Sequence, residues 1–184
     1  MLGGSASRNG ELVNSPLGLY RLIVRLVLKI DGRNRIANDS DCHAVVLTTE
    51  LINHARKKVD VFCRELSDSV WGTDDVIGAI RAALARGIRF HVLVQKSIEE
   101  CGNARAYRLF SENGVPVRHY RKQTNDADPA APMVNFMIVD DKAFRFEPDS
   151  AVHKGFAYAR NEELAKQISE TFGRIWKASD AKVG

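Results

Sequence analysis

The sequence is poor in the features that mark secreted or zinc-binding proteins. It contains three cysteines in 184 residues, Cys42, Cys63 and Cys101, and no Cys-x-x-Cys pair. An odd, scattered set of thiols argues against a disulfide framework and a zinc site, and predicts a chain of the reducing cytosol. The N-terminus has no basic region followed by an apolar core and a cleavage site, so no signal peptide is expected.

Long apolar runs and metal-ligand patterns are also missing. The longest apolar stretch, Leu17–Ile30, is too short to span a bilayer and contains three cations, so no membrane span is expected. His43, His54 and His91 stand at no metal-ligand spacing from a carboxylate or thiol, and no metal or other cofactor is predicted. The expected location is the cytoplasm.

What is present is the composition of one globular domain. The chain is 45% hydrophobic and 27% charged, and 184 residues suffice for one well-buried domain but are cramped for two. Its formal net charge of +4 allows anionic partners such as nucleic acid or phosphorylated ligands. We expect an N-terminal extension over residues 1–32 and one domain over 33–184.

The apolar stretch Leu17–Ile30 is compatible with a helix or a strand. On a helix, Arg21, Arg25 and Lys29 recur every four residues and form one basic stripe. The same run is rich in β-branched residues and ends at Asp31-Gly32, a hairpin turn pair. Either form is expected to pack on the domain or on a twin subunit, with a membrane surface or nucleic acid as the alternatives.

From residue 41 onward, hydrophobic periodicity and turn signals predict alternating helices and strands. Helices are expected over 44–58, 73–86, 103–112 and 162–176, and strands over 59–62, 88–94, 115–120, 133–140 and 143–146. Alternation of this kind produces right-handed βαβ units. The predicted fold class is therefore α/β, with a mixed, largely parallel sheet flanked by helices.

The strand from Met133 to Asp140 carries the most specific pattern. It resembles the signature His-x-Lys-x4-Asp strand of the phospholipase D superfamily, because Phe136-Met137-Ile138-Val139-Asp140-Asp141 reads like the end of that motif. Asp140 stands at the aspartate position, but Met133 stands at the histidine position and Asn135 at the lysine position. The resemblance extends over about residues 33–179 and implies a phospholipase D-like fold.

The departures from the motif bear on function. In active members the histidine forms a phosphohistidine and the lysine stabilises the phosphoryl oxygens, whereas a Met thioether is no phosphate nucleophile and Asn carries no charge. The family's Gly-Ser pair falls near Glu147-Pro148, where a carboxylate repels phosphate. The resemblance also implies a homodimer, because a chain with one motif needs a second copy to assemble a site; we expect Met133 and Asn135 near its twofold axis.

Two cationic groups remain as candidate anion-binding residues. Arg118, His119, Arg121 and Lys122 surround the end of a predicted strand, and His153 and Lys154 follow the motif hairpin. Such clusters hold anions through charge-assisted hydrogen bonds, although most are solvated strand or loop ends.

These observations favour a non-catalytic phospholipase D-like domain that acts as a binding or assembly module, with a protein partner, a phosphate-containing ligand or nucleic acid to recognise. The alternative is a phosphodiesterase or nuclease with a non-standard active site, for which His153 is one candidate nucleophile. Plain nucleic-acid binding would require a contiguous basic face built from the Leu17–Ile30 cations and the Arg118–Lys122 group.

Overall fold

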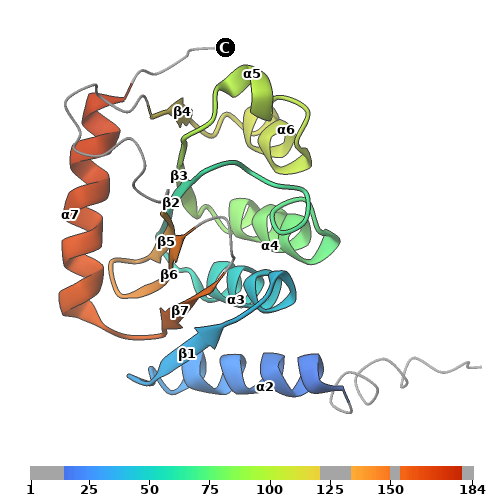
Figure 1. Ribbon diagram of the computed structural model, residues 1–184, viewed down its shortest axis with the longest axis vertical. Helices are drawn as coiled ribbons and strands as arrows, with labels where there is room; N and C mark the ends of the chain where they lie inside the picture. The colour runs from blue at the N-terminus through green and yellow to red at the C-terminus, as the bar shows by residue number, and fades with distance from the viewer. Residues whose placement is uncertain (1–14, 121–133, 150–153, 180–184) are drawn as a thin grey trace, which may run out of the picture.

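The computed structural model describes residues 15–120, 134–149 and 154–179 (Figure 1). Its helices are α2 (Pro16–Lys29), α3 (Asp41–His54), α4 (Asp74–Ala85), α5 (Ile98–Cys101), α6 (Arg105–Glu112) and α7 (Glu162–Ala178). Its strands are β1 (Arg35–Asn38), β2 (Lys58–Cys63), β3 (Arg89–Val94), β4 (Val117–His119), β5 (Asn135–Val139), β6 (Ala143–Asp149) and β7 (Lys154–Tyr158).

The seven strands form one mixed sheet in the order β1-β7-β6-β5-β2-β3-β4. The α/β class and the mixed sheet are confirmed, but the expectation of a largely parallel sheet is wrong. Only β2 with β3 and β3 with β4 pair in parallel, while the other four pairings are antiparallel. The helix-strand alternation produces crossover connections only as far as β4, after which β5, β6 and β7 follow one another as antiparallel neighbours.

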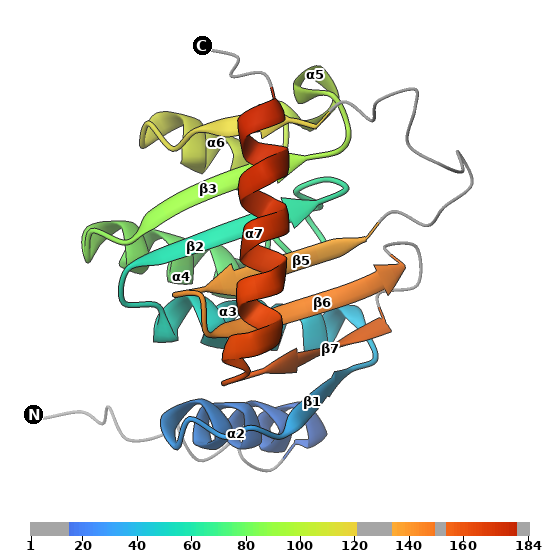
Figure 2. The ribbon, with the colours of Figure 1, turned by 90° about the vertical axis from the view of Figure 1, so that its left-hand side faces the viewer.

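Helices cover both faces of the sheet (Figures 1 and 2). On one face α3, α4 and α6 pack over the larger core, which includes Leu47, Val61 and Ile80. On the other face α7 crosses β2, β5 and β6 alone, over a smaller cluster that includes Phe136 and Phe172. Side chains alternate across each strand, so neighbouring residues of β5 contribute to different cores.

The helix ends follow from local sequence. The Asn161 side chain accepts a hydrogen bond from the backbone N–H of Leu164 and caps α7, as its position before Glu162 and Glu163 predicts. Gly87 lies just beyond α4 with φ of 78°, in the left-handed conformation that ends helices. Helix α3 ends at His54 and not at residue 58, because Lys58 already belongs to β2.

The apolar stretch after residue 15 is a helix, which resolves the choice that its sequence left open. Pro16 occupies the first turn, and the Ser15 hydroxyl accepts from the N–H of Gly18 at 3.0 Å. Val24 and Leu28 are buried in the larger core, where α2 packs against α3. The division of the chain at residue 32 stays a prediction. Among the helices of the described segments, none is long and apolar enough to cross a membrane.

Candidate functional site

Asn135 is the first residue of β5 and lies beside the carboxyl end of β2. It lies directly opposite Glu147 of β6, and its Oδ1 accepts a hydrogen bond from the backbone N–H of Arg64, just after β2, at 2.7 Å. The carboxyl ends of parallel strands are where α/β sheets place their ligands. Met133 lies outside the described residues, so the structure locates the candidate lysine position but not the candidate histidine position.

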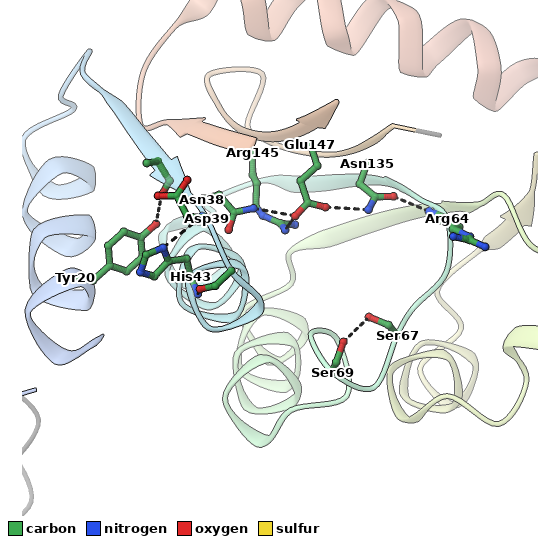
Figure 3. Close-up of polar contacts among 12 residues, drawn as sticks. Tyr20, Asn38, Asp39, His43, Arg64, Ser67, Ser69, Asn135, Arg145 and Glu147 are labelled. Atoms are coloured by element: carbon green, nitrogen blue, oxygen red, sulfur yellow. Dashed lines mark hydrogen bonds and ion pairs between the residues drawn. The ribbon is translucent and has the colours of Figure 1, made fainter. Parts of the chain in front are cut away.

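Glu147 is the centre of a buried hydrogen-bond network at this end of β5 (Figure 3). Its side chain is 1% exposed. Asn135 Nδ2 donates to Oε2 at 2.9 Å, and Asn38 Nδ2 donates to Oε1 at 2.8 Å. Arg145, two residues earlier on the same strand face, forms an ion pair with Oε1. Three side-chain donors therefore converge on this one carboxylate.

Asn38 reaches this network across an intervening strand. It belongs to β1, where it pairs with Gly155 of β7, whereas Glu147 belongs to β6. A Cβ built at Gly155 meets the carbonyl oxygen of Phe146 at 2.1 Å and the Cα of Glu147 at 3.0 Å. Glycine is therefore the one residue that lets β7 approach β6 here, and its missing side chain leaves the path between Asn38 and Glu147 open.

Arg145 is the counter-ion of Glu147. Its side chain is 4% exposed, and burial lowers the pKa of its guanidinium while the neighbouring Glu147 raises it. Its Nε has no hydrogen-bond partner among the described residues. A buried charge of this kind is tolerated only with a partner, so Arg145 and Glu147 depend on each other.

A cavity of about 340 Å³ opens beside this network. The described residues of its wall include aromatic rings, two hydroxyls and four charged groups: Phe62, Trp71 and Phe136; Ser67 and Ser69; Arg64, Glu65, Arg145 and Glu147. With two arginines and two glutamates, the formal charges of this wall cancel. The cavity has the size of a small-molecule site, but its described wall offers no net positive charge to an anion.

The other end of β5 is built around Asp140. Its carboxylate accepts hydrogen bonds from the backbone N–H groups of Arg56, Lys57 and Lys58 at 2.8, 2.8 and 2.9 Å. Asp140 and Asp141 have φ values of 55° and 56°, as the two central residues of a tight hairpin turn require. Asp140 therefore ties the β5–β6 turn to the segment between α3 and β2, and needs no catalytic histidine to orient.

Asp141 has a smaller role in the same turn. It forms an ion pair with Lys58 at 2.8 Å and accepts from the Ser169 hydroxyl of α7 at 2.7 Å. Burial raises the pKa of its carboxyl, but the hydrogen bonds from Lys58 and Ser169 outweigh burial and hold the pKa below its ordinary value. Asp141 thus attaches α7 to the turn.

Among the candidate anion-binding residues that the structure describes, Arg118 and His119 lie far from Lys154 in the sheet. Arg118 stacks on the Trp176 ring at 4.2 Å and donates to the Trp176 carbonyl, whereas His119 lies near the backbone oxygen of Gln95. Lys154 begins β7, which four strands separate from β4 in the sheet. Arg121, Lys122 and His153 lie outside the described residues.

The basic stripe of α2 is not a free cationic surface. Arg25 Nε contacts Glu50 of α3 at 2.9 Å, and Arg21 bridges Glu50 and Asp75 of α4. In both views α2 lies at the opposite end of the molecule from β4, which carries Arg118 (Figures 1 and 2). Within the described part of the chain, the α2 cations and Arg118 therefore do not form a contiguous basic face.

Sequence reasoning identified Glu147 but missed Asn38 and Arg145. Arg145 alternates with Phe144 and Phe146, so it faces the same side of β6 as Glu147, and this spacing signals a same-face pair. Asn38 gave no signal, because its contact with Glu147 spans 109 residues. No group of three or more His, Cys, Asp or Glu side chains within the described segments is placed to hold a metal ion.

The family model described as "Domain of unknown function (DUF7931)" matches residues 40–183. The chain belongs to this family. No curated protein sequence matches it. Among solved structures, this DUF7931 chain is similar to the phospholipase D family member Nuc from Salmonella typhimurium, with a TM-score of 0.55 at 15% identity over 76% of this chain and 90% of that one.

Two further structures share the arrangement. NucT from Helicobacter pylori has a TM-score of 0.59 at 12% identity, over 80% of this chain and 97% of that one. The archaeal chromatin protein TrmBL2 has a TM-score of 0.57 at 15% identity, over 89% of this chain and 59% of that one. The fold is therefore phospholipase D-like, as the motif resemblance implied.

Proposed function

We propose that this DUF7931 protein is a non-catalytic phospholipase D-like domain that acts as a binding or assembly module. The observation that carries the proposal is the buried Glu147 carboxylate, which is held by three donors, one of them Asn135. The resemblance assigns this position to the phosphate pocket. A phosphate placed here would lie beside a buried carboxylate whose charge Arg145 only balances, so the pair offers it no net attraction.

The surroundings of Glu147 support the same proposal. Arg145 already neutralises Glu147, so it is not available as a second cation for a phosphate. Asn135 accepts from Arg64 through Oδ1 and donates to Glu147 through Nδ2. Both polar atoms of its amide therefore serve the network, and the side chain brings no positive charge to a ligand. Without a nucleophile at position 133, the cavity can enclose a neutral or zwitterionic small molecule but offers no path to a phosphoenzyme.

The test is a phosphodiesterase assay of the full chain in EDTA with bis(p-nitrophenyl) phosphate, phosphatidylcholine and DNA. We expect no turnover above the buffer rate. Metal-free turnover that disappears in His119→Ala or His153→Ala would overturn the proposal and identify a non-standard active site. Lys154→Ala is the matched control, since it removes a neighbouring cation but no nucleophile or general acid.

Nucleic acid is the second candidate ligand, because the similar archaeal chromatin protein is described as binding DNA. A gel-shift titration with duplex DNA at 50 and 200 mM salt tests it. If duplex DNA binds a cationic surface of this protein, the binding falls steeply with salt and weakens in Arg118→Ala. We expect no shift at 200 mM salt if the module binds protein alone.

A further inference from the structure

Exposed aliphatic side chains are concentrated on α2. Seven large hydrophobic residues of the described segments are exposed, and six of them belong to α2 or its C-cap, the seventh being Leu164 of α7. Five of the six stand three or four residues apart or adjacent on one face, and we call them the α2 stripe: Leu19, Leu22, Ile23, Leu26 and Ile30.

The stripe lies opposite the buried side of the helix. Val24 and Leu28 face the core, so α2 is apolar on two opposite sides and only one of them is covered. In both views α2 is the outermost element at its end of the molecule (Figures 1 and 2). The stripe exposes on the order of 500 Å² of apolar surface, at the upper end of the range for monomers.

We propose that the α2 stripe is the interface with a second copy of this chain, with the two α2 helices antiparallel about a twofold axis. Four of the five stripe positions form two pairs that are symmetric about the bond between residues 24 and 25. Antiparallel pairing about that point places Leu19 opposite the partner subunit's Ile30. It places Ile23 opposite the partner subunit's Leu26, which is the self-complementary arrangement that a twofold interface requires.

The remaining position fits as well, because Leu22 falls opposite the partner subunit's Val27. Complete burial of both stripes removes about 1,000 Å² in total from water, which is the minimum area expected of a biological interface. Val27 packs partly against the larger core and is half-buried within the monomer, so the exposed part of its side chain contributes to this contact.

The charges around the stripe favour a second copy over a lipid surface. A membrane-surface helix needs free cations beside its apolar face, but Arg21 and Arg25 are bridged to Glu50 and Asp75. Lys29 is exposed, and antiparallel pairing separates the two copies of Lys29 by about 13 Å along the helix axis. That distance exceeds the Debye length of about 10 Å at 0.1 M salt, so the two cations do not oppose pairing.

This interface deepens the assembly role proposed above and does not depend on the loss of catalysis. It differs from the sequence-based expectation of a twofold axis beside Asn135, which the same experiment tests. A monomer without phosphodiesterase activity would overturn the interface and leave the non-catalytic proposal standing, whereas an active dimer would do the reverse.

The first experiment is sedimentation equilibrium of the full chain from 1 to 100 μM. We expect a dimer of twice the 20.5 kDa chain mass, and at least a 100-fold weaker association in Leu22→Glu, which buries a charge in the contact. Leu164→Glu is the matched control, because Leu22 and Leu164 are both 38% exposed. Thermal melts followed by circular dichroism verify that both variants fold.

Cross-linking tests the antiparallel arrangement in a Cys42→Ser background, since Cys42 is the exposed cysteine among three. Leu19→Cys mixed with Ile30→Cys is expected to form the heterodimeric disulfide on mild oxidation. Either variant alone is expected to stay uncross-linked, and cross-linking of each variant with itself would overturn the antiparallel pairing.

Three outcomes would overturn the interface. One is a mass of 20.5 kDa at all concentrations. The second is a dimer that Leu22→Glu leaves intact, which would favour the motif face. The third is a monomer that co-sediments with phosphatidylserine vesicles and loses this binding in Leu22→Glu, which would identify a lipid surface as the occupant.

Discussion

The polar residues at the two ends of β5 make different kinds of contact. At its start, Asn135, Glu147 and Arg145 form a buried, charge-balanced network beside a cavity. At its end, Asp140 uses its carboxylate on three backbone N–H groups of a neighbouring segment. The phospholipase D-like pattern is kept at the end that holds the fold together and departs at the end where the resemblance places chemistry.

One short motif therefore combines two separable parts. Asp140 satisfies backbone N–H donors, which the chain presents whatever side chains Arg56, Lys57 and Lys58 carry. The polar residues at the start of the strand need only satisfy one another, so their identities can change as a set. Three substitutions test whether the two ends are separable in this way.

The largest effect is expected at the start of β5. Glu147→Gln removes the charge that balances Arg145, and an unpaired buried guanidinium costs about 3–5 kcal/mol. Urea unfolding measures the loss. The double variant Arg145→Met/Glu147→Leu removes both charges and is expected to recover most of that stability. A double variant as unstable as Glu147→Gln would mean that the network is needed for more than charge balance.

A somewhat smaller loss is expected at the end of β5. Asp140→Ala leaves three backbone N–H groups without their charged acceptor, and we expect the free energy of unfolding to fall by about 2–4 kcal/mol. Asp141→Ala is the control, since it has the same left-handed backbone but partly exposed partners worth about 0–1 kcal/mol. Equal losses in the two variants would assign the effect to turn conformation and not to the Asp140 hydrogen bonds.

The smallest effect is a pH dependence at the same end. Burial and the nearby Arg56 hold the pKa of His54 below its ordinary value of 6.5. The unfolded chain then binds more protons than the folded one below pH 6.5, so the His54 contribution is complete above pH 6.5 and is lost as the pH falls toward the folded pKa. We expect urea midpoints to fall from pH 7.5 to 5 in the native chain and less in His54→Gln. The same dependence of the urea midpoint on pH in both proteins would contradict this role of His54.

Most of the α/β pattern was predictable because it depends on local signals. Thr73 with Asp74 and Asp75 marked the start of α4, Asn161 marked α7, and the turn at Asp140 and Asp141 marked the hairpin. The strands β1 and β7 were missed. Each is only four or five residues long, and their pairing joins segments more than a hundred residues apart, so no local periodicity identifies them.

The sequence by itself determined helices α3, α4, α6 and α7, the central strands and the departures from the phospholipase D pattern, because spacing and residue type are local properties. The tertiary structure decided the rest. It made the sheet mostly antiparallel, placed Asn38 on Glu147 across Gly155, and left the outer face of α2 exposed. Each of these outcomes depends on which distant segments meet, and contact between distant segments is a property of the folded chain alone.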